Sequence, residues 1–394
     1  MKGSRLKELF FLDVIYLDNA ATSWPKPECV YQAVDRFNRE IGANPGRGSH
    51  RKAVEAGMVL LETRELLAKL FNVRDSSRIV FLPNATYALN LALKGVLNPG
   101  DHAVISSMEH NAVARPLHTL EQRGVEVSIV QCAPDGSLDP RDVEMAIRDN
   151  TRLICLVHAS NLTGTIMPVE EVGRIARERG VLFLVDAAQT AGVLPIDVEA
   201  MHIDLLAFTG HKGLFGPQGT GGLYIRQGLE LHPLIEGGTG SLSEELSQPD
   251  FLPDRFESGT PNTPGLAGLG AGVRYLLEIG VEKVRQHEQE LTELLLCGLR
   301  EIEGVTVYGP CDSRRQVAVV SFNIEGIGCG EVSLLLDKGY GIITRSGLHC
   351  APLAHRTIGT IKTGACRLSP GFFNTAEDIE KTVRAIAEIA GGKW

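Results

Sequence analysis

Several polar side chains follow short apolar runs at the points where predicted strands end. Asp186 ends VLFLVD, Lys212 ends DLLAFTGHK, His110 follows HAVISSME, and Asn161 follows LICLVHAS. In open α/β sheets, ligands bind beyond the carboxyl ends of the strands. Taken singly, each residue has an ordinary alternative: a solvated lysine, a helix-capping aspartate or a hydrogen-bonded structural histidine. Their convergence on one sheet edge predicts a shared binding site.

These residue types together suit one cofactor, pyridoxal 5'-phosphate. The Lys212 amine can bond an aldehyde, and the Asp186 carboxylate can keep a pyridine nitrogen protonated, so that the ring withdraws electrons. The flat His110 ring can stack on such a cofactor. The turn 84–86, which follows RIVFLP, opens a predicted helix whose free N–H groups favour an anion. We therefore expect pyridoxal 5'-phosphate at this edge.

A thiol and a guanidinium lie near the C-terminal end of the sequence. The segment ITRSGLHCAPLAH (343–355) places Cys350 between Gly347 and Pro352, on a predicted loop. From spacing alone, an incidental loop cysteine is the alternative interpretation. The segment ACRLSPGFFNT (365–375) contains Arg367, whose fork suits a carboxylate, with an ordinary surface ion pair as the alternative.

The elements that would position these groups alternate between apolar strands and amphipathic helices. The predicted strands lie within 78–83, 102–109, 125–132, 152–160, 181–189, 204–212 and 220–226. Such alternation predicts an α/β fold with a mostly parallel sheet covered by helices on both faces.

The pattern changes near residue 278. A long amphipathic helix (281–302), two short strands and a closing helix (375–390) indicate a smaller α+β module. We expect a large cofactor-binding domain over 15–278 and a small domain over 279–394. Residues 1–14 are expected to form an extension on or near the small domain, with Val14 as an alternative start.

Composition excludes several classes of protein. The net charge is −9, and no cluster of Lys or Arg suits nucleic acid. The eight cysteines are scattered without a CxxC or zinc-type spacing, so we expect no metal and a reducing, cytoplasmic location. Asp13 interrupts the apolar run FFLDVIYL, so neither a signal peptide nor a membrane association is expected.

The chain resembles the class V aminotransferase family, of the fold type I pyridoxal-phosphate enzymes, and within it the cysteine desulfurase and selenocysteine lyase branch. The resemblance extends over nearly the whole chain from Tyr16. Its segments are YLDNAATSWPKP (16–27), NPGRGSH (44–50), SSMEHNA (106–112), NLTGTIMPVEE (161–171), VDAAQTAG (185–192), TGHKGLFGPQGTGGLY (209–224) and FESGTPNT (256–263).

The resemblance implies a role for each site residue. Lys212 would hold the cofactor as a Schiff base, Asp186 would pair with the pyridine nitrogen, and His110 would stack on the ring. Gln189 would bond the phenolic oxygen, and Asn161 would lie near the substrate. The phosphate would be held by Thr86, Thr209, His211, the backbone at Ala85, and Thr260 of a second copy, which implies a homodimer. Family members more often carry two hydroxyl or Gly-rich residues at 84–85.

Group II desulfurases have a similar Arg-x-Gly-x-His-Cys-Ala segment, with the nucleophile at the position of Cys350. Arg345 and His349 match this segment, and Arg367 matches the residue that binds the substrate carboxylate. The resemblance implies removal of sulfur or selenium from L-cysteine or L-selenocysteine, giving L-alanine and a persulfide on Cys350, with transfer to a sulfur-acceptor protein. Cysteine sulfinate remains a further candidate substrate. The alternatives are an aminotransferase or epimerase without a persulfide, and a non-catalytic scaffold.

Overall fold

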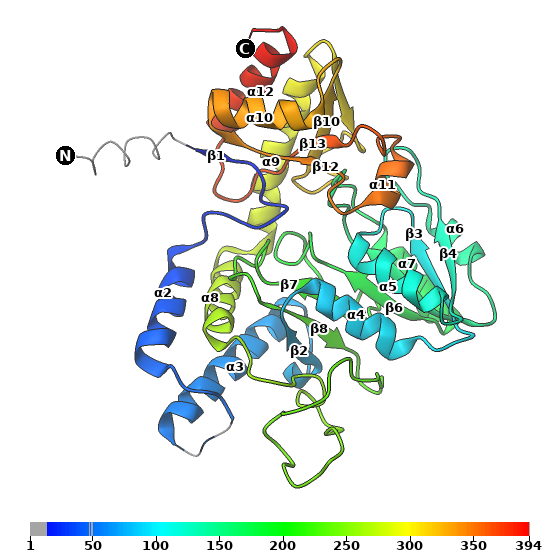
Figure 1. The fold of residues 1–394 in the computed structure, drawn as a ribbon, viewed down its shortest axis with the longest axis vertical. Coiled ribbons are helices and arrows are strands. Elements are labelled where there is room, and N and C mark those ends of the chain that lie inside the picture. Colours follow the sequence, from blue (N-terminus) through cyan, green and yellow to red (C-terminus); the bar gives the residue numbers. More distant parts are fainter. Residues whose placement is uncertain (1–13, 47, 49, 394) are drawn as a thin grey trace.

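A seven-stranded sheet forms the centre of the larger part of the molecule (Figure 1). The computed structural model describes residues 14–46, 48 and 50–393. The sheet order is β2-β8-β7-β6-β5-β3-β4, and β8 alone runs opposite to the other six strands. The strands are β2 (Ile79–Leu82), β3 (His102–Ser106), β4 (Glu126–Val130), β5 (Thr151–Val157), β6 (Leu182–Asp186), β7 (Leu205–Thr209) and β8 (Gly221–Ile225). The mostly parallel sheet predicted from the strand–helix alternation is thus confirmed.

Helices cover both faces of this sheet, as its continuously apolar strands require. On β6, Phe183 and Val185 pack in a cluster with α3, α7 and α8, whereas Leu184 packs with α4 and α5. The helices of this part are α2 (Glu28–Arg36), α3 (Arg51–Leu70), α4 (Ala85–Val96), α5 (Asn111–Glu121), α6 (Pro140–Met145), α7 (Val169–Arg179) and α8 (Thr263–Ile279), with a π-helical turn η1 (Phe37–Ile41) and a 3-10 turn η2 (Ser76–Arg78).

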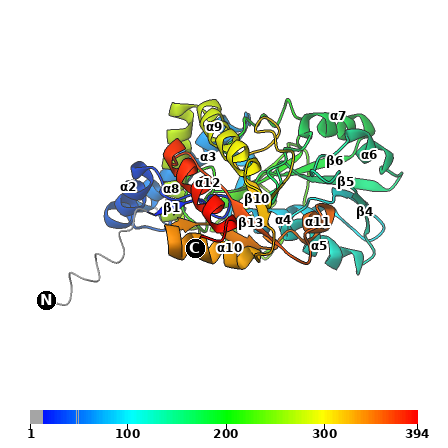
Figure 2. The ribbon, with the colours of Figure 1, turned by 90° about the horizontal axis from the view of Figure 1, so that it is seen from above.

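The C-terminal part forms a second module beside the sheet (Figures 1 and 2). Its antiparallel sheet has the order β12-β13-β10-β9. The elements are α9 (Val281–Arg300), β9 (Val305–Tyr308), β10 (Val320–Ile324), α10 (Cys329–Tyr340), β11 (Ile342–Ile343), β12 (Arg345–Gly347), α11 (Pro352–Thr357), β13 (Ala365–Leu368) and α12 (Ala376–Ala390). A capping box between Thr375 and Asp378 fixes the start of α12.

The segment that follows residue 14 joins this C-terminal module. β1 (Ile15–Tyr16) pairs in parallel with β11, and Ile15 and Leu17 pack in the apolar core of the module. The expected large domain began at residue 15, so the structure places its first residues with the opposite module. The domain boundary near 278 stays a prediction, and the expected extension lies, except for the exposed Val14, outside the described residues.

Two general features of the described ranges bear on function. No helix there is long and apolar enough to cross a bilayer. No group of three or more His, Cys, Asp or Glu side chains there could hold a metal ion.

Candidate active site

A cavity of about 200 Å³ lies beyond the carboxyl ends of β5, β6 and β7. It brings together most of the site residues predicted from the sequence. Those that line it are Ala85, Thr86, His110, Asn161, Asp186, Gln189, Thr209, His211 and Lys212. Asn84, Leu89, Ala112, Val157 and Ala188 complete the wall.

Lys212 and Asp186 give this cavity one amine and one carboxylate. Burial lowers the pKa of Lys212 to about 8, against the opposing attraction of Asp186. Burial also raises the pKa of Asp186, although the backbone N–H of Ala188 donates to one carboxylate oxygen over 2.9 Å. Among the described residues, the Lys212 amine has no hydrogen-bond partner. Near neutral pH the amine is therefore partly uncharged and available to bond a ligand.

His110 is held in one orientation at the start of α5. Its Nδ1 accepts a hydrogen bond from the backbone N–H of Ala112 over 3.0 Å, which leaves the proton on Nε2. Burial, Lys212 and Arg345 lower its pKa to about 4. His110 thus presents a neutral, fixed ring to the cavity.

The start of α4 provides the side of the cavity that can hold an anion. Asn84 caps this helix by accepting from the backbone N–H of Tyr87 over 3.2 Å. A Cβ on Gly221 of β8 would lie 2.9 Å from the Asn84 Cα atom, so only glycine lets the strand approach the turn this closely. The Thr209 hydroxyl and His211 Nδ1 are buried without a partner among the described residues. Two orphaned polar groups beside a helix N-terminus are suited to a bound anion.

Asn161 links the cavity to the loop that carries Cys350. Its side-chain amide donates to the backbone carbonyl of His349 over 2.8 Å, and the backbone N–H of Asn111 donates to the carbonyl of Cys350 over 2.8 Å. His349 and Cys350 have φ values of +48° and +56°, which is uncommon for two consecutive non-glycine residues. Two hydrogen bonds from the cavity rim therefore hold a strained loop in place.

The Cys350 side chain is exposed and does not line the 200 Å³ cavity. It lines an adjacent hollow of about 370 Å³, together with Thr86, His110 and Ala112, which also line the cavity. The thiol therefore lies beside the cavity, with His110 between the two spaces. Behind the loop, the buried His349 ring stacks on His355, and burial lowers the pKa of His349 to about 3.

Arg367 is not a surface residue. It is fully buried, donates to Asp18 over 2.6 Å and to the backbone carbonyl of Asn161 over 2.9 Å, and its Nε has no partner among the described residues. Arg345 lies directly opposite it in the β12–β13 pair. Like charges opposite each other in a sheet repel. Asp18 and a bound anion would therefore both reduce the repulsion between the Arg345 and Arg367 guanidinium groups.

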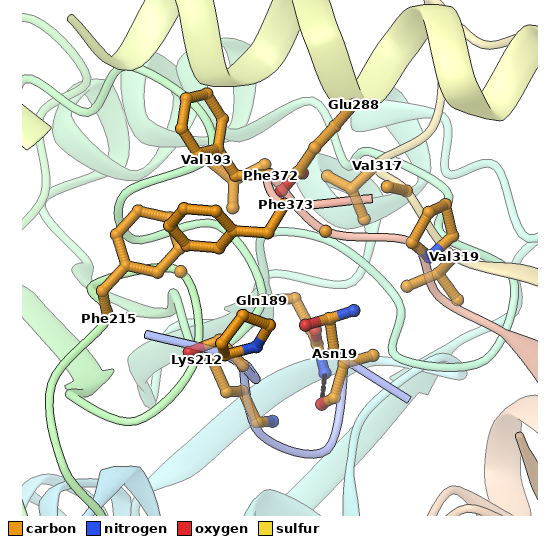
Figure 3. A pocket seen from close by; sticks show the side chains of 17 residues that line it. Asn19, Gln189, Val193, Lys212, Phe215, Glu288, Val317, Val319, Phe372 and Phe373 are labelled. Atoms are coloured by element: carbon orange, nitrogen blue, oxygen red, sulfur yellow. Dashed lines mark hydrogen bonds between the residues drawn. The ribbon is translucent and has the colours of Figure 1, made fainter. Parts of the chain in front are cut away.

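A smaller cavity of about 40 Å³ shares Gln189 and Lys212 with the larger one (Figure 3). Phe215, Phe372 and Phe373 form an aromatic wall, and Glu288 of α9 points from above toward the two latter rings. Within the described ranges, the Glu288 carboxyl has no hydrogen-bond or ion-pair partner. Burial raises its pKa to about 8, opposed by Arg285. The group is therefore a neutral acid at pH 7.

A second buried acid, Glu109, directly precedes His110 in the sequence. Its Oε1 accepts from the Ser106 hydroxyl over 2.6 Å and from the backbone N–H of Val157 over 3.0 Å, while Oε2 has no partner in the described structure. Burial raises its pKa to about 8. The acid thereby ties the end of β3 to the end of β5, where Val157 lines the cavity.

Sequence reasoning missed the roles of Asp18, Glu109 and Glu288. Asp18 belongs to YLDNAAT, but its partner is Arg367, 349 positions later. Glu109 precedes His110 directly, and its position at a strand end was the available signal. Glu288 lies on the apolar face of α9, where a lone acid among buried leucines was the corresponding signal.

Thr260 is exposed and does not line the cavity of its own chain. The structure therefore does not bring it together with the other predicted anion-holding residues of this chain. Gln189, in contrast, lines both cavities and donates to the backbone carbonyl of Ala20 over 3.1 Å.

The similarity to known proteins extends over nearly the whole chain. A model of the family described as aminotransferase class-V matches residues 15–382. A probable cysteine desulfurase of Methanothermobacter thermautotrophicus is 38% identical over 96% of this chain and 95% of its own length. The apo structure of a cysteine desulfurase from Thermococcus onnurineus NA1 superposes with a TM-score of 0.90 and 37% identity, covering 96% of this chain and 95% of that one. The structure of a cysteine desulfurase from Escherichia coli, in an S-sulfonic acid form, superposes with a TM-score of 0.86 and 29% sequence identity. It covers 96% of this chain and 95% of that one.

Proposed function

The chain belongs to the aminotransferase class-V family, and on that premise we propose that it is a pyridoxal-phosphate-dependent cysteine desulfurase. It converts L-cysteine to L-alanine and keeps the released sulfur as a persulfide on Cys350. L-selenocysteine is the parallel substrate, because it has the same carboxylate and amine.

The residues of the 200 Å³ cavity fit the cofactor. The orphaned Thr209 hydroxyl and His211 Nδ1, with the start of α4 at Ala85 and Thr86, suit its phosphate. The partly uncharged Lys212 amine suits its aldehyde. Asp186 suits its ring nitrogen, His110 its ring face and Gln189 its phenolic oxygen. When bound, the cofactor would supply an electron sink for charge that develops on the substrate Cα.

The chain's own residues then bind and deprotonate the substrate. Arg367, oriented by Asp18, holds the α-carboxylate, with Arg345 beside it and Asn161 at the cavity wall. Lys212 Nζ takes the Cα proton, since its lowered pKa gives a free base near neutral pH.

Cys350 removes the sulfur. Its thiolate attacks the substrate sulfur, so that an S–S bond forms and the C–S bond breaks. The electron pair of the C–S bond stays with the three-carbon fragment, which leaves as L-alanine after protonation. The neutral His349 ring behind the loop and the carbonyl anchors at Asn161 and Asn111 hold the nucleophile at the rim.

One observation carries the choice of desulfurase over aminotransferase. Cys350 lines a hollow that shares Thr86, His110 and Ala112 with the Lys212 cavity. An aminotransferase requires no thiol at that place.

The test is incubation with L-cysteine in the presence of a reductant, with alanine and sulfide measured together. We expect equal amounts of both, and a protein mass increased by one sulfur atom when the reductant is omitted. Cys350→Ser should abolish all three signals, whereas Cys297→Ser, at another exposed cysteine, should retain them. Wild-type turnover in Cys350→Ser, or a keto acid product without alanine, would contradict the proposal. Parallel incubations with selenocysteine and cysteine sulfinate define the substrate.

Partners and location are part of the same proposal. The exposed Thr260 suits a homodimer in which it reaches the phosphate held by a second copy. The exposed Cys350 suits transfer of sulfur to an acceptor protein. A reducing cytoplasm suits the eight free cysteines.

A further inference from the structure

A buried ion pair closes the open edge of the central sheet. Arg64 of α3 and Glu257 form two hydrogen bonds of 2.7 and 3.1 Å, with side chains 7% and 15% exposed. Glu257 also accepts from the backbone N–H of Phe81 over 2.6 Å, and Arg64 donates to the backbone carbonyl of Ile79. The Arg64 guanidinium lies 4.2 Å from the centre of the Phe81 ring.

These contacts replace the backbone hydrogen bonds that a further strand would make at this edge of the sheet. β2 is an edge strand that pairs only with β8, so the Ile79 carbonyl and the Phe81 N–H face away from the ladder. The ion pair satisfies both groups. It therefore joins the segment around residue 257 to a rigid strand.

The anchored segment carries an exposed threonine at its tip. Glu257 lies three positions before Thr260, and Asn262 lies two positions after it. Asn262 caps α8 by accepting from Gly265 N and donates to the Gly219 carbonyl over 3.2 Å. Thr260 is thus an exposed residue between two anchored positions, and the whole connection from β8 to α8 (226–262) contains no helix or strand.

We propose that the Arg64–Glu257 pair is a positioning element for phosphate binding, because it fixes the place from which Thr260 reaches the cofactor phosphate of a second copy. This inference rests on the proposed cofactor and homodimer. A directional ion pair suits the task, since an Arg–carboxylate fork defines orientation as well as distance. Neither Arg64 nor Glu257 lines the 200 Å³ cavity.

The experiment compares two aldehydes that differ only in the phosphate. Cofactor-free protein is titrated with pyridoxal 5'-phosphate and with pyridoxal, and binding is followed by visible absorbance. Glu257→Gln keeps the size of the side chain and removes its charge. We expect the dissociation constant for pyridoxal 5'-phosphate to rise about tenfold, as for loss of one charge-assisted contact, and that for pyridoxal to change less than twofold.

The second measurement tests whether the effect passes through Thr260. If it does, Thr260→Ala and the double variant Thr260→Ala/Glu257→Gln should bind pyridoxal 5'-phosphate with the same affinity to within about twofold. Should Glu257→Gln fail to fold, Arg64→Lys is the second variant, because it retains the positive charge and removes the two-pronged guanidinium contact. It should likewise weaken the binding of pyridoxal 5'-phosphate and leave that of pyridoxal nearly unchanged.

Asp204→Asn is the matched control. Asp204 also pairs with an arginine, Arg226, and also accepts from a strand N–H, that of Phe183, but at the opposite end of β6 from the cavity. This variant should change neither dissociation constant. The inference would be overturned if Glu257→Gln weakened the binding of both aldehydes equally or weakened neither. It would also be overturned if the losses of affinity of the two single variants multiplied in the double variant. Wild-type protein that bound neither aldehyde would contradict the proposed function instead.

Discussion

Replacing Glu288 by glutamine should stabilise the protein at alkaline pH. In the folded protein the Glu288 pKa is about 8, whereas the ordinary value of a glutamate is 4.5. The folded state therefore holds a proton that the unfolded chain releases. The stability contributed by this protonated acid is complete below pH 4.5 and is lost as the pH rises through about 8. Glutamine has a similar size and no proton to lose.

The pKa difference sets the magnitude. Each unit of pKa difference corresponds to about 1.36 kcal/mol. Between pH 5 and 8, Glu288 alone should therefore lower the free energy of unfolding by about 1.36 kcal/mol per pH unit, with a total loss of at most about 5 kcal/mol. The Glu288→Gln variant lacks this slope. The two proteins should be about equally stable near pH 4.5 and differ by several kcal/mol at pH 8.

Urea denaturation of the holoenzyme at half-unit intervals from pH 5 to 8.5 measures this difference. Glu109 also has a pKa raised to about 8, but it is present in both proteins and its contribution cancels. Glu290→Gln, on the exposed face of the same helix, is the control and should follow the wild type. Parallel curves of unfolding free energy against pH for wild type and Glu288→Gln would refute the assignment of a neutral acid to the 40 Å³ cavity.

Three further predictions concern residues in and beside the 200 Å³ cavity. Asp18→Asn removes the carboxylate that orients the Arg367 guanidinium, so the KM for L-cysteine should rise about tenfold while the cofactor absorbance stays unchanged; an unaltered KM in steady-state kinetics would exclude this role. The His110 pKa of about 4 predicts that its ring signals do not titrate in NMR spectra between pH 5.5 and 8.5, and a midpoint near 6.5 would contradict the described burial. The Lys212 pKa of about 8 predicts that the rate at which cofactor-free protein captures pyridoxal rises with pH and levels off above about 8; a rate that still rises to pH 10 would indicate a solvated amine.

The sequence predicted the elements that follow strong local rules. Strands such as β6 are continuous apolar runs. Asp186 ends β6 and Lys212 lies three positions after the end of β7, so their meeting at one edge was predictable from topology. The helices over residues 28–70 were not predicted. In α3 the buried face includes Ala53, Thr63 and Arg64, and small or polar residues make a weak apolar stripe.

The unpredicted parts of the site depend on contacts between distant positions. Nothing near Arg367 indicates that its partner is Asp18, and nothing near Glu257 indicates Arg64, 193 positions earlier. Likewise, the loop that places Cys350 outside the 200 Å³ cavity is held by hydrogen bonds from Asn161 to the His349 carbonyl and from Asn111 to the Cys350 carbonyl, which no local pattern encodes.

The pairing of β1 with β11 has a consequence for the order of events during synthesis on the ribosome. Every strand of the central sheet has been translated by residue 225, so most of the cofactor cavity can form while the remaining chain is still being made. Ile15 and Asp18, among the earliest described residues to emerge, must wait for Ile342 and Arg367. The Asp18–Arg367 pair can therefore form only after residue 367 has been made, which is later than the strands whose ends line the 200 Å³ cavity.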